Sequence, residues 1–507
     1  MIRLWTVAAI ALLLSACGSG TTPGSAQSPK TGGSLRVAQE TEIVTLDPAQ
    51  SRLIVEREVY YNLYDSLIGI DAKLDFVPAL ATAWRYPDLQ TLVLTLRQGV
   101  KFQDGTEFDA EAAKFNLDRY ITDPSSNRKS ELASVASVEA QDEYTVVLHL
   151  SRPDGTLLAQ LVDRAGMMLS PAAVRKAGGN LSVEPAGAGS GPFEFVEWKR
   201  DDHLTLKRNP GYWRKDRAGR RLPYLDGVTF HPRPDYSAIV AGLKSGDFDF
   251  ARTVNSKDVA AIRADPGLVY RDVPGLGFHG MWLNSSAAPF DDPKKARAVA
   301  MAIDRAEILK DVVFGMGTIS HGPITPVSWA YDPSEKIYDR PDVEGARATA
   351  TGFSFTLRLA ANQEDMEVGE LLRAQLAKAG INVDLVTEDF GKLVTEASQH
   401  QFQAALLSWS GRIDPDGNTY TVFHTGGGIN YGLYSNPEVD QLLEHARFST
   451  DQAKRKQLYQ EAQRIIVRDA AYVFTYDPAV PEIASVKVRN FTLVPDGINR
   501  FGEVWLA

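Results

Sequence analysis

A single cysteine, Cys17, is the feature that most constrains how this chain of 507 residues can fold. One cysteine cannot form a disulfide within the chain, and it cannot supply the several thiolates of a structural zinc site. The folded protein must therefore be held together by its buried apolar side chains alone. Hydrophobic residues make up 44% of the sequence, which is enough for a large core, and the length predicts two or three structural units.

Cys17 ends a short apolar segment at the N-terminus. Residues 2–14 carry one charge, Arg3, and are followed by the small residues Ser15 and Ala16. This order is typical of a secretory signal, and the apolar run is too short to cross a bilayer. Because a cysteine stands where cleavage is expected, the segment resembles a bacterial lipobox, whose cysteine is lipidated, with palmitate for example, and becomes the new N-terminus. A plain signal peptide with a chance cysteine is the alternative.

We therefore predict a lipoprotein signal over residues 1–16, a lipid anchor to the cell membrane at Cys17, and a flexible tether over residues 17–33, which are rich in Gly, Ser, Thr and Pro. The formal charge of −10 comes without a long basic run, so nucleic-acid binding is disfavoured. No second apolar stretch approaches the roughly 20 residues of a membrane helix. The folded part should therefore lie outside the cytoplasm, held near the membrane by its anchor.

The remaining sequence alternates between strand-like and helix-like patterns, which predicts an α/β protein. The clearest unit is a parallel strand-helix-strand crossover over residues 353–359, 366–378 and 381–386. A long helix is expected over 294–314, with Asp291 or Asp292 as its cap and Pro293 at its first position. Further helices are expected over 55–67, 109–120, 437–447 and 451–468, and strands over 34–38, 92–96, 144–150, 404–409 and 472–476.

Seven short motifs along the chain carry a family resemblance. They read GSLRVA at 33–38 with LDP at 46–48, LYDSL at 63–67, PALA at 78–81 before Trp84, LRQGVKFQDGT at 96–106, GSGPF at 189–193, RNPGYW at 208–213 and AIDR at 302–305. In this order they resemble the extracytoplasmic solute-binding proteins of ABC importers for peptides, oligopeptides and nickel, known as solute-binding protein family 5. The similarity covers nearly all of the chain beyond the signal.

The resemblance implies a two-lobed α/β fold of the class II periplasmic-binding-protein type, with the ligand cleft between the lobes. The first lobe would comprise residues 34–75, 185–284 and 475–507, with an inserted subdomain over 76–184, and the second lobe residues 285–474. Such a protein is a monomer without cofactor or catalysis, which closes on its ligand by a hinge motion and presents it to a membrane permease and its ATPase.

The implied ligand is a peptide or a related small polar solute. Its identity stays open among dipeptides, oligopeptides, glutathione-like compounds, opines, sugar conjugates and metal complexes.

The segment 409–423, WSGRIDPDGNTYTVF, carries most of the specific chemistry. It leaves an expected buried strand, so its residues stand where open α/β sheets place ligands. Trp409 offers a flat apolar face and an N–H donor, and Arg412 offers a planar fork suited to a carboxylate. Asp414 and Asp416 are expected to form a turn or to cap a helix that runs through Tyr420, or else to contact the ligand.

The family resemblance gives one position of this segment a particular meaning. The Trp that matches Trp409 lines the cleft in the family, and many peptide binders carry an acidic residue three positions later that pairs with the ligand's amino group. This chain has Arg412 there, so recognition of an amine would need Asp414, Asp416, Glu40 or Glu42. Our hypothesis is that Arg412 faces an anionic group of the ligand. Solvent exposure and an internal salt bridge are the alternatives.

Three other segments match cleft segments of the family. One follows the first strand, one is the strand by which the chain crosses between lobes, and one follows a run of three glycines. Their candidate ligand contacts are Glu40, Thr41, Glu42, Phe278, His279, Trp282, Asn284, Asn430 and Tyr431.

Several motif matches do not indicate a nucleotide or metal site. GLGFHG at 275–280 satisfies GxGxxG, but a strand-like run follows where a nucleotide site needs a helix. Residues 414–425 begin like a calcium loop but have Thr419 at position six and Thr425 at position twelve, where Gly and Glu are needed. The eight histidines show no paired metal spacing, so we expect no metal site.

Two rival functions stay open at this stage. An exported, lipid-anchored hydrolase would use Asp414 and Asp416 as a paired acid and base. A receptor or chaperone for signalling peptides would bind without a transporter. Neither carboxylate has a sequence signature for the hydrolase role, and a permease and ATPase encoded beside this gene would argue against the receptor.

Overall fold

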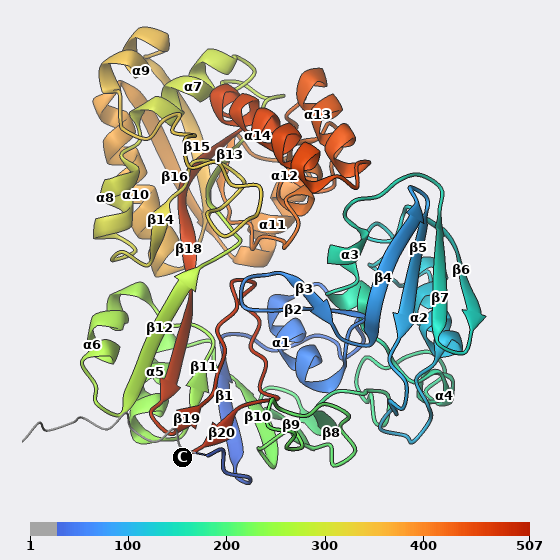
Figure 1. Cartoon of the computed structure of the whole chain (residues 1–507). Helices are drawn as coiled ribbons and strands as arrows, with labels where there is room; N and C mark the ends of the chain where they lie inside the picture. Colours follow the sequence, from blue (N-terminus) through green and yellow to red (C-terminus); the bar gives the residue numbers. More distant parts are fainter. Residues whose placement is uncertain (1–27) are drawn as a thin grey trace, which may run out of the picture.

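The computed structural model of the protein describes residues 28–507. Cys17, the expected signal over 1–16 and most of the expected tether lie outside the described residues. Two lobes and an inserted subdomain are visible in Figure 1. Among the described residues, no helix combines the length and the apolar character that crossing a bilayer requires.

One long strand, β18 (Tyr472–Ser485), belongs to both lobes. Its first half pairs with β13 (His279–Leu283) and β14 (Gly317–Ile319), and its second half pairs with β12 (Leu268–Pro274) and β11 (Phe250–Ala251). Figure 1 shows β18 running from the upper lobe into the lower one. The lobes are thus joined by this strand and by the short connection between β12 and β13.

The first lobe is built on the strands that extend from the second half of β18. β1 (Ser34–Gln39) pairs in parallel with β10 (Gly227–Pro232) and with β11. β9 (His203–Arg208) and β8 (Phe193–Lys199) continue the sheet in antiparallel fashion. Leu35 and Val37 of β1 are fully buried, as the apolar alternation of an expected first strand requires.

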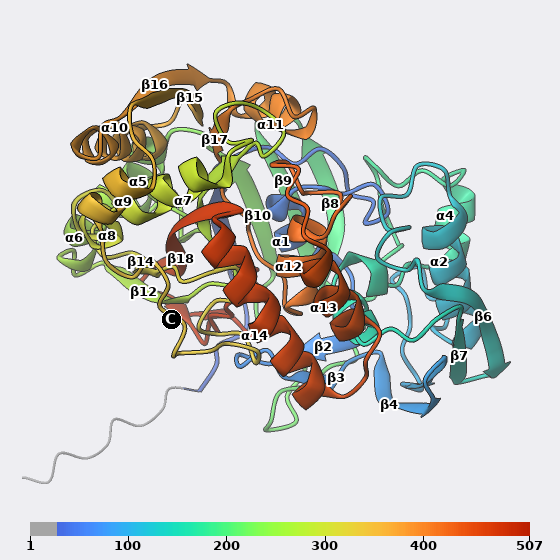
Figure 2. The same ribbon diagram turned by 90° about the horizontal axis from the view of Figure 1, so that it is seen from above.

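The inserted subdomain has its own antiparallel sheet, in the order β4 (Ala81–Asp88), β5 (Thr91–Leu96), β7 (Thr145–Leu150), β6 (Val135–Asp142). α2 (Ala110–Thr122) packs on this sheet and is capped by Asp109, which accepts a bond of 2.8 Å from the N–H of Ala112. Both views place the subdomain to one side of the lobes (Figures 1 and 2).

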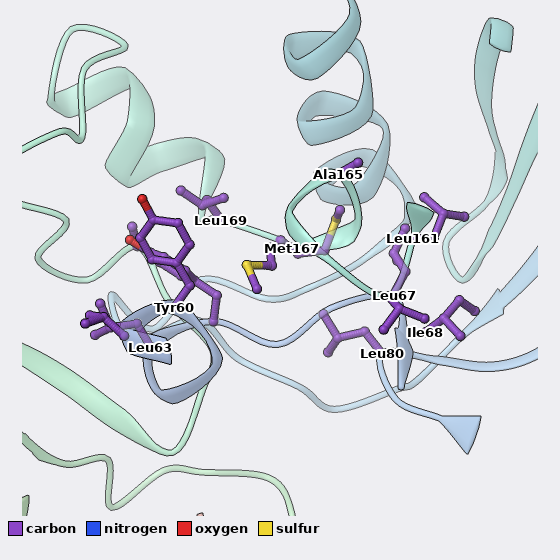
Figure 3. Close-up of a cluster of buried hydrophobic side chains, with 14 of the residues drawn as sticks. Tyr60, Leu63, Leu67, Ile68, Leu80, Leu161, Ala165, Met167 and Leu169 are labelled. Carbon is purple, nitrogen blue, oxygen red and sulfur yellow. The ribbon is translucent and has the colours of Figure 1, made fainter. Parts of the chain in front are cut away.

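The subdomain and the first lobe share one core. α1 (Ile54–Leu63) supplies Tyr60 and Leu63, which belong to the same buried cluster as Leu161 and Met167 from the subdomain (Figure 3). Because the core is continuous, the subdomain is expected to move together with the first lobe.

The second lobe contains the expected crossover. β15 (Phe353–Ala360), α10 (Gln363–Lys378) and β16 (Ile381–Glu388) form a parallel strand-helix-strand unit, so that prediction is confirmed. β17 (Ala404–Leu406) pairs in parallel with the other side of β15, and β13 pairs with β17. Helices α13 (Pro437–Arg447) and α14 (Gln452–Asp469) form the expected helical pair beside this sheet.

The single long helix predicted over 294–314 is wrong, because the chain forms two helices there. α7 (Pro293–Ala302), capped by Asp292 as expected, ends at an extended Ile303, and Asp304 caps a new helix, α8 (Arg305–Asp311). The buried side chain of Arg305 donates to the carbonyl groups of Ala300 and Ile303. The last carbonyls of α7 therefore have partners, and the helix can stop inside a buried region.

The remaining elements connect these layers. They are β2 (Ile68–Ile70), β3 (Phe76–Pro78), α3 (Leu157–Gln160), η1 (Arg164–Gly166), α4 (Pro171–Lys176), α5 (Tyr236–Ser245), η2 (Ser256–Asp258), α6 (Val259–Arg263), α9 (Val343–Thr349), α11 (Phe390–Ser398), α12 (Asp416–Phe423), β19 (Val488–Arg489) and β20 (Trp505–Leu506).

The predicted lobe boundaries stay a prediction, but strand pairing bears on one of them. β13 pairs with β17 and with the first half of β18, so residues 279–283 lie in the sheet of the second lobe. The predicted first lobe continued to residue 284.

Glu58 ties α1 to two other parts of the first lobe. Its buried carboxylate accepts hydrogen bonds from the side-chain amides of Gln39, at 2.6 Å, and Asn499, at 2.5 Å. Burial raises the pKa of Glu58 to about 7, although the charge of Arg252 and the two amide donors act in the opposite direction. The folded state therefore binds this proton more tightly than the unfolded chain.

We predict that the free energy of unfolding falls as the pH rises from about 4.5, the pKa expected in the unfolded chain, through 7. The loss that Glu58 causes is about 3 kcal/mol across this window. Urea titrations at several pH values should show that Glu58→Gln lacks it, whereas Glu197→Gln, at an exposed position, keeps the parent's profile. A constant difference between Glu58→Gln and the parent at every pH would contradict this explanation.

Candidate functional site

The segment 409–423 lies where the chain crosses between the lobes. After β17 the chain continues as a loop to α12, and Trp409 exchanges two backbone hydrogen bonds, of 3.0 and 2.9 Å, with Phe278. Phe278 belongs to the connection between β12 and β13, one of the two links between the lobes. The loop from the second lobe thus packs directly on a hinge connection.

Two glycines make this close packing possible. A Cβ atom on Gly277 would lie 2.3 Å from the carbonyl oxygen of Trp409, and one on Gly411 would lie 2.2 Å from the carbonyl carbon of Leu276. Gly411 also has a φ of +79°, which favours glycine. Gly277, part of the GxGxxG match, therefore allows two backbones to touch, which is a structural role.

Asn418 and Trp409 hold Arg412 in place. The Asn418 side-chain oxygen accepts from the Trp409 indole N–H at 3.0 Å and from the Arg412 backbone N–H at 2.8 Å. The Arg412 guanidinium lies over the Trp409 ring, 4.4 Å from its centroid. Its Nη1 donates to Gly411 and Ser410, at 2.6 and 3.2 Å. Among residues 28–507 no protein acceptor faces its Nε or Nη2, and no carboxylate pairs with it, so the internal salt bridge considered for Arg412 is wrong.

Two cations and two carboxylates act on the charge of Arg412, and the cations act more strongly. Burial lowers the pKa of Arg412 to about 9, and Arg57 of α1 and Arg164 of η1 lower it further, while Asp163 and Glu131 act in the opposite direction. Asp163 pairs with Arg57, whose Nε lies 3.0 Å from its Oδ2. Arginines of the first lobe and its subdomain thus face an arginine of the second lobe.

Asp414 and Asp416 are each neutralised by an arginine of the second lobe. Arg455 Nη2 lies 2.6 Å from Asp414 Oδ1, and Arg447 contacts Asp416 through Nε at 3.0 Å and Nη2 at 2.5 Å. Both carboxylates are buried. Asp414 also accepts a 3.0 Å bond from the Asp416 N–H, so the expected turn is present.

Pro415 stands at the N-cap position of α12 and provides no side-chain cap. Asp414, one residue earlier, accepts from the N–H of Asp416 in the first turn of this helix instead. Tyr420, on this helix, lies under the Arg447 guanidinium, 3.4 Å from its ring centroid.

The candidates after β1 differ in their surroundings. Glu40 forms a bidentate ion pair with Arg252. Glu42 accepts from the indole N–H of Trp198 at 2.9 Å and from the N–H of Asp201 at 2.8 Å, on the turn between β8 and β9. Thr41 is exposed. Both acidic groups are already engaged, so neither is a free acceptor for a ligand amine.

The candidates on the crossing strand are packed in the core of the second lobe. Phe278, His279, Trp282 and Asn284 are all buried. His279 Nδ1 lies 2.8 Å from the Thr475 hydroxyl, and the Asn284 amide donates to backbone carbonyls at 3.0 and 2.9 Å. These contacts are those of structural residues, and their role in ligand binding stays a prediction.

The two candidates after the glycine run differ in their surroundings. Asn430 is buried and holds a turn: it accepts from the N–H of Tyr434 and donates to the carbonyl of the same residue. Tyr431 is half-buried with its ring 5.5 Å from that of Trp282.

Sequence reasoning missed Arg57, Asp163 and Arg164. Arg57 and Asp163 stand 106 positions apart, in segments that no sequence motif connects. Arg412 alone carried a signal, because it departs from the family pattern.

A polar pocket near α1 is a separate feature. It has a volume of about 240 Å³ and lies in the first lobe, between α1 and the C-terminal segment. Asp65 in its wall already accepts from the Trp213 indole N–H at 2.8 Å and from the Tyr212 hydroxyl at 3.2 Å. None of the predicted site residues lines it. The residues that the structure describes also hold no cluster of His, Cys, Asp or Glu suited to a metal ion.

Comparison with known proteins gives a consistent result. The sequence model of the bacterial extracellular solute-binding proteins, family 5, matches residues 75–430. The glutathione-binding protein GsiB of Pectobacterium atrosepticum is 28% identical over 501 residues, which cover 93% of this chain and 94% of that protein.

Solved structures agree with the sequence matches. The periplasmic binding protein DppA of Helicobacter pylori, in complex with the peptide STSA, has a TM-score of 0.82 and 25% identity, covering 94% of this chain and 98% of that one. The oligopeptide-binding protein AppA of Bacillus subtilis, in complex with a nonapeptide, has a TM-score of 0.82 and 26% identity, covering 95% of this chain and all of that one.

These matches decide between the functional classes. The relatives are binding proteins of two-lobed architecture, so the expected fold is confirmed and the hydrolase alternative is wrong. The ion pairs of Asp414 and Asp416 agree, because neither carboxylate is free to act as acid or base. The chain belongs to the bacterial extracellular solute-binding proteins, family 5, and is a non-enzymatic solute-binding component of an ABC importer.

Proposed function

We propose that this protein captures a peptide-like solute with an anionic group between its lobes, at Arg412, and delivers it to a membrane permease and its ATPase. The observation that carries the proposal is the position of Arg412 at the lobe crossing. Its guanidinium has hydrogen-bond donors left over and no carboxylate within ion-pair distance among the described residues. Arg57 and Arg164 of the opposite side act on its charge more strongly than the carboxylates Asp163 and Glu131.

The relatives support a solute of this kind. The GsiB proteins are named for glutathione, a tripeptide with two carboxylates and one amine, which is net negative at neutral pH. The structures of DppA and AppA hold peptides. Glutathione and short acidic peptides are therefore the first solutes to test.

We further propose that the lobes follow the predicted boundaries, apart from residues 279–283, and that they close as a hinge on the two connecting segments. Contacts that bridge the lobes support this. Ile413, in the loop of the second lobe, packs into the core cluster of the first. The N–H of Gly155, in the inserted subdomain, donates to the carbonyl of Arg447 at 2.8 Å, and Arg455 Nη1 donates back to the Gly155 carbonyl at 2.8 Å.

The N-terminal segment would hold the protein at the membrane. Lipidation of Cys17 would leave the tether of residues 17–33 between the membrane and a monomeric binding domain. A short flexible tether raises the effective concentration of the loaded protein at its permease.

Arg412→Ala is predicted to weaken glutathione binding roughly 10- to 100-fold, because a charge-assisted hydrogen bond to the anionic group is lost. Isothermal titration calorimetry measures this directly. Arg217→Ala, at an exposed position in the first lobe, serves as the control and should bind like the parent. Equal affinity of Arg412→Ala and the parent would remove Arg412 from the site. Failure of the parent to bind glutathione or any di- or tripeptide would overturn the proposed solute class.

Gly155→Ala is predicted to weaken solute binding about tenfold by disfavouring closure. A Cβ atom on Gly155 would lie 2.0 Å from the Ser449 carbonyl oxygen, so the subdomain would have to move away from the second lobe. Gly502→Ala is the matched control, because a Cβ there meets only ordinary contacts of 3.6 Å or more. X-ray scattering with saturating solute should show a larger radius of gyration for Gly155→Ala alone; identical profiles for all three proteins would contradict the closing role of this contact.

Cys17→Ala is predicted to release the protein from the membrane fraction while leaving its solute affinity unchanged. Fractionation of cells followed by immunoblotting checks the location, and calorimetry on the purified variant checks the binding. A variant that stays in the membrane fraction would show that the anchor is not at Cys17.

A further inference from the structure

The arginines around Arg412 form a group with unusual surroundings. Arg57 comes from α1, Arg164 from η1 of the inserted subdomain, and Arg412 from the loop before α12. The side chains of Arg57 and Arg164 are 7% and 6% exposed. Arginine is seldom buried to this degree unless its charge is paired and its donors are used.

The donors of this group are only partly used. A guanidinium has five N–H donors. Arg57 uses Nε toward Asp163, at 3.1 Å, as its only hydrogen bond within the described residues. Arg164 uses Nη1 toward the Ser51 hydroxyl at 3.2 Å, and its buried Nε has no hydrogen-bond partner in the described part of the chain. Arg412 has Nε and Nη2 left over.

The charges of the group are also unbalanced. Arg57, Arg164 and Arg412 face one carboxylate, Asp163. The next charged groups, Arg128 and Glu131, pair with each other. These three cations and Asp163, with a neutral pair beside them, leave two positive charges over. A further buried carboxylate, Glu56, accepts from the same Ser51 hydroxyl that Arg164 contacts and offsets part of this excess. An uncompensated buried charge destabilises a protein unless something of opposite sign binds there.

The pKa values of Asp163 and Arg164 reflect the excess of positive charge around them. Burial raises the pKa of Asp163, but Arg57, Arg164 and Arg412 lower it more, to well below its usual range. Burial lowers the pKa of Arg164, and Arg128 and Arg57 lower it further. Asp163 is thus fully ionised and still does not balance its neighbours.

The carboxylates that could attract a ligand amine are occupied. Asp414, Asp416 and Glu40 are paired with Arg455, Arg447 and Arg252. Glu42 is bonded to the turn between β8 and β9. The charge left over at the lobe crossing is therefore positive, which favours a solute that is net negative over a zwitterion.

We propose that Arg57, Arg164 and Arg412 form one binding site for two anionic groups of the solute, and that these groups draw the lobes together. The inference rests on the proposed function and specifies its solute as a peptide-like dicarboxylate. Without solute, the cations on the two sides repel each other across the lobe boundary. A solute with two carboxylates reverses that repulsion, so closure is favoured only when such a solute is present.

The test compares solutes that carry different numbers of carboxylates. Calorimetry on the parent should show that glutathione binds roughly 10- to 100-fold more tightly than its glycine monoethyl ester, which lacks one carboxylate. The dipeptides Glu-Glu, Ala-Glu and Ala-Ala should bind with affinities that fall in that order.

Substitutions of Arg164 test whether the preference for glutathione over its ester depends on the arginines. In Arg164→Gln the preference for glutathione over its ester should shrink at least fivefold, a coupling that a purely structural role would not produce. Arg164→Lys keeps the charge and should retain part of the preference, and its thermal unfolding midpoint reports whether the fold is intact. Arg217→Gln, at an exposed site, should keep the whole preference.

The outcomes separate this inference from the function it rests on. If the parent binds peptides but the esters and Ala-Ala bind as tightly as their acidic counterparts, the two-anion site is wrong and the peptide-binding function stands. An unchanged preference in Arg164→Gln overturns the site in the same way. If no peptide and no form of glutathione binds, the proposed solute class fails, and the site fails with it.

Discussion

The rest of this structure depends on the backbone pairing of β18 with two sheets. Its first residues are hydrogen-bonded in the second lobe and its last residues in the first, so the two cores cannot separate without breaking a ladder. The lobes can turn only about the point in β18 where pairing with β14 ends, at Pro478, and pairing with β12 begins, at Ala479, and about the connection between β12 and β13. Both features fit a protein that opens and closes as two rigid bodies.

This arrangement explains where chemistry can gather. The loop of residues 409–415 follows β17 and packs on the connection at Leu276 and Gly277, so its side chains lie beside the link between the lobes. α1 and η1 contribute Arg57 and Arg164 from the first lobe and its subdomain. A solute bound there would contact both lobes at once, so its binding would be coupled to their closure.

Elements with their own local pattern could be predicted from the sequence. Features that depend on contacts between distant parts of the chain could not. The crossover over 353–386 was predictable, because each of its elements has its own periodicity and its own stop signal. The break at Ile303 was not, because it depends on Arg305 reaching the end of α7 within a buried region. Arg412 was visible as a departure from a family pattern. The arginines that pair with Asp416 and Asp414 come from α13 and α14. They are too far away along the chain for a local sequence pattern to indicate which arginine pairs with which aspartate.

Arg455 has a consequence that reaches beyond the contact between lobes. One guanidinium nitrogen binds the Gly155 carbonyl in the inserted subdomain, and another binds Asp414 beside Arg412. The same side chain thus fastens the inserted subdomain to the second lobe and forms the ion pair of Asp414. A solute too long for the closed form would push the subdomain away from the second lobe and pull on the arginine that pairs with Asp414. The size and the charge of the solute would then both affect the contacts of one residue, Arg455, rather than two independent parts of the protein.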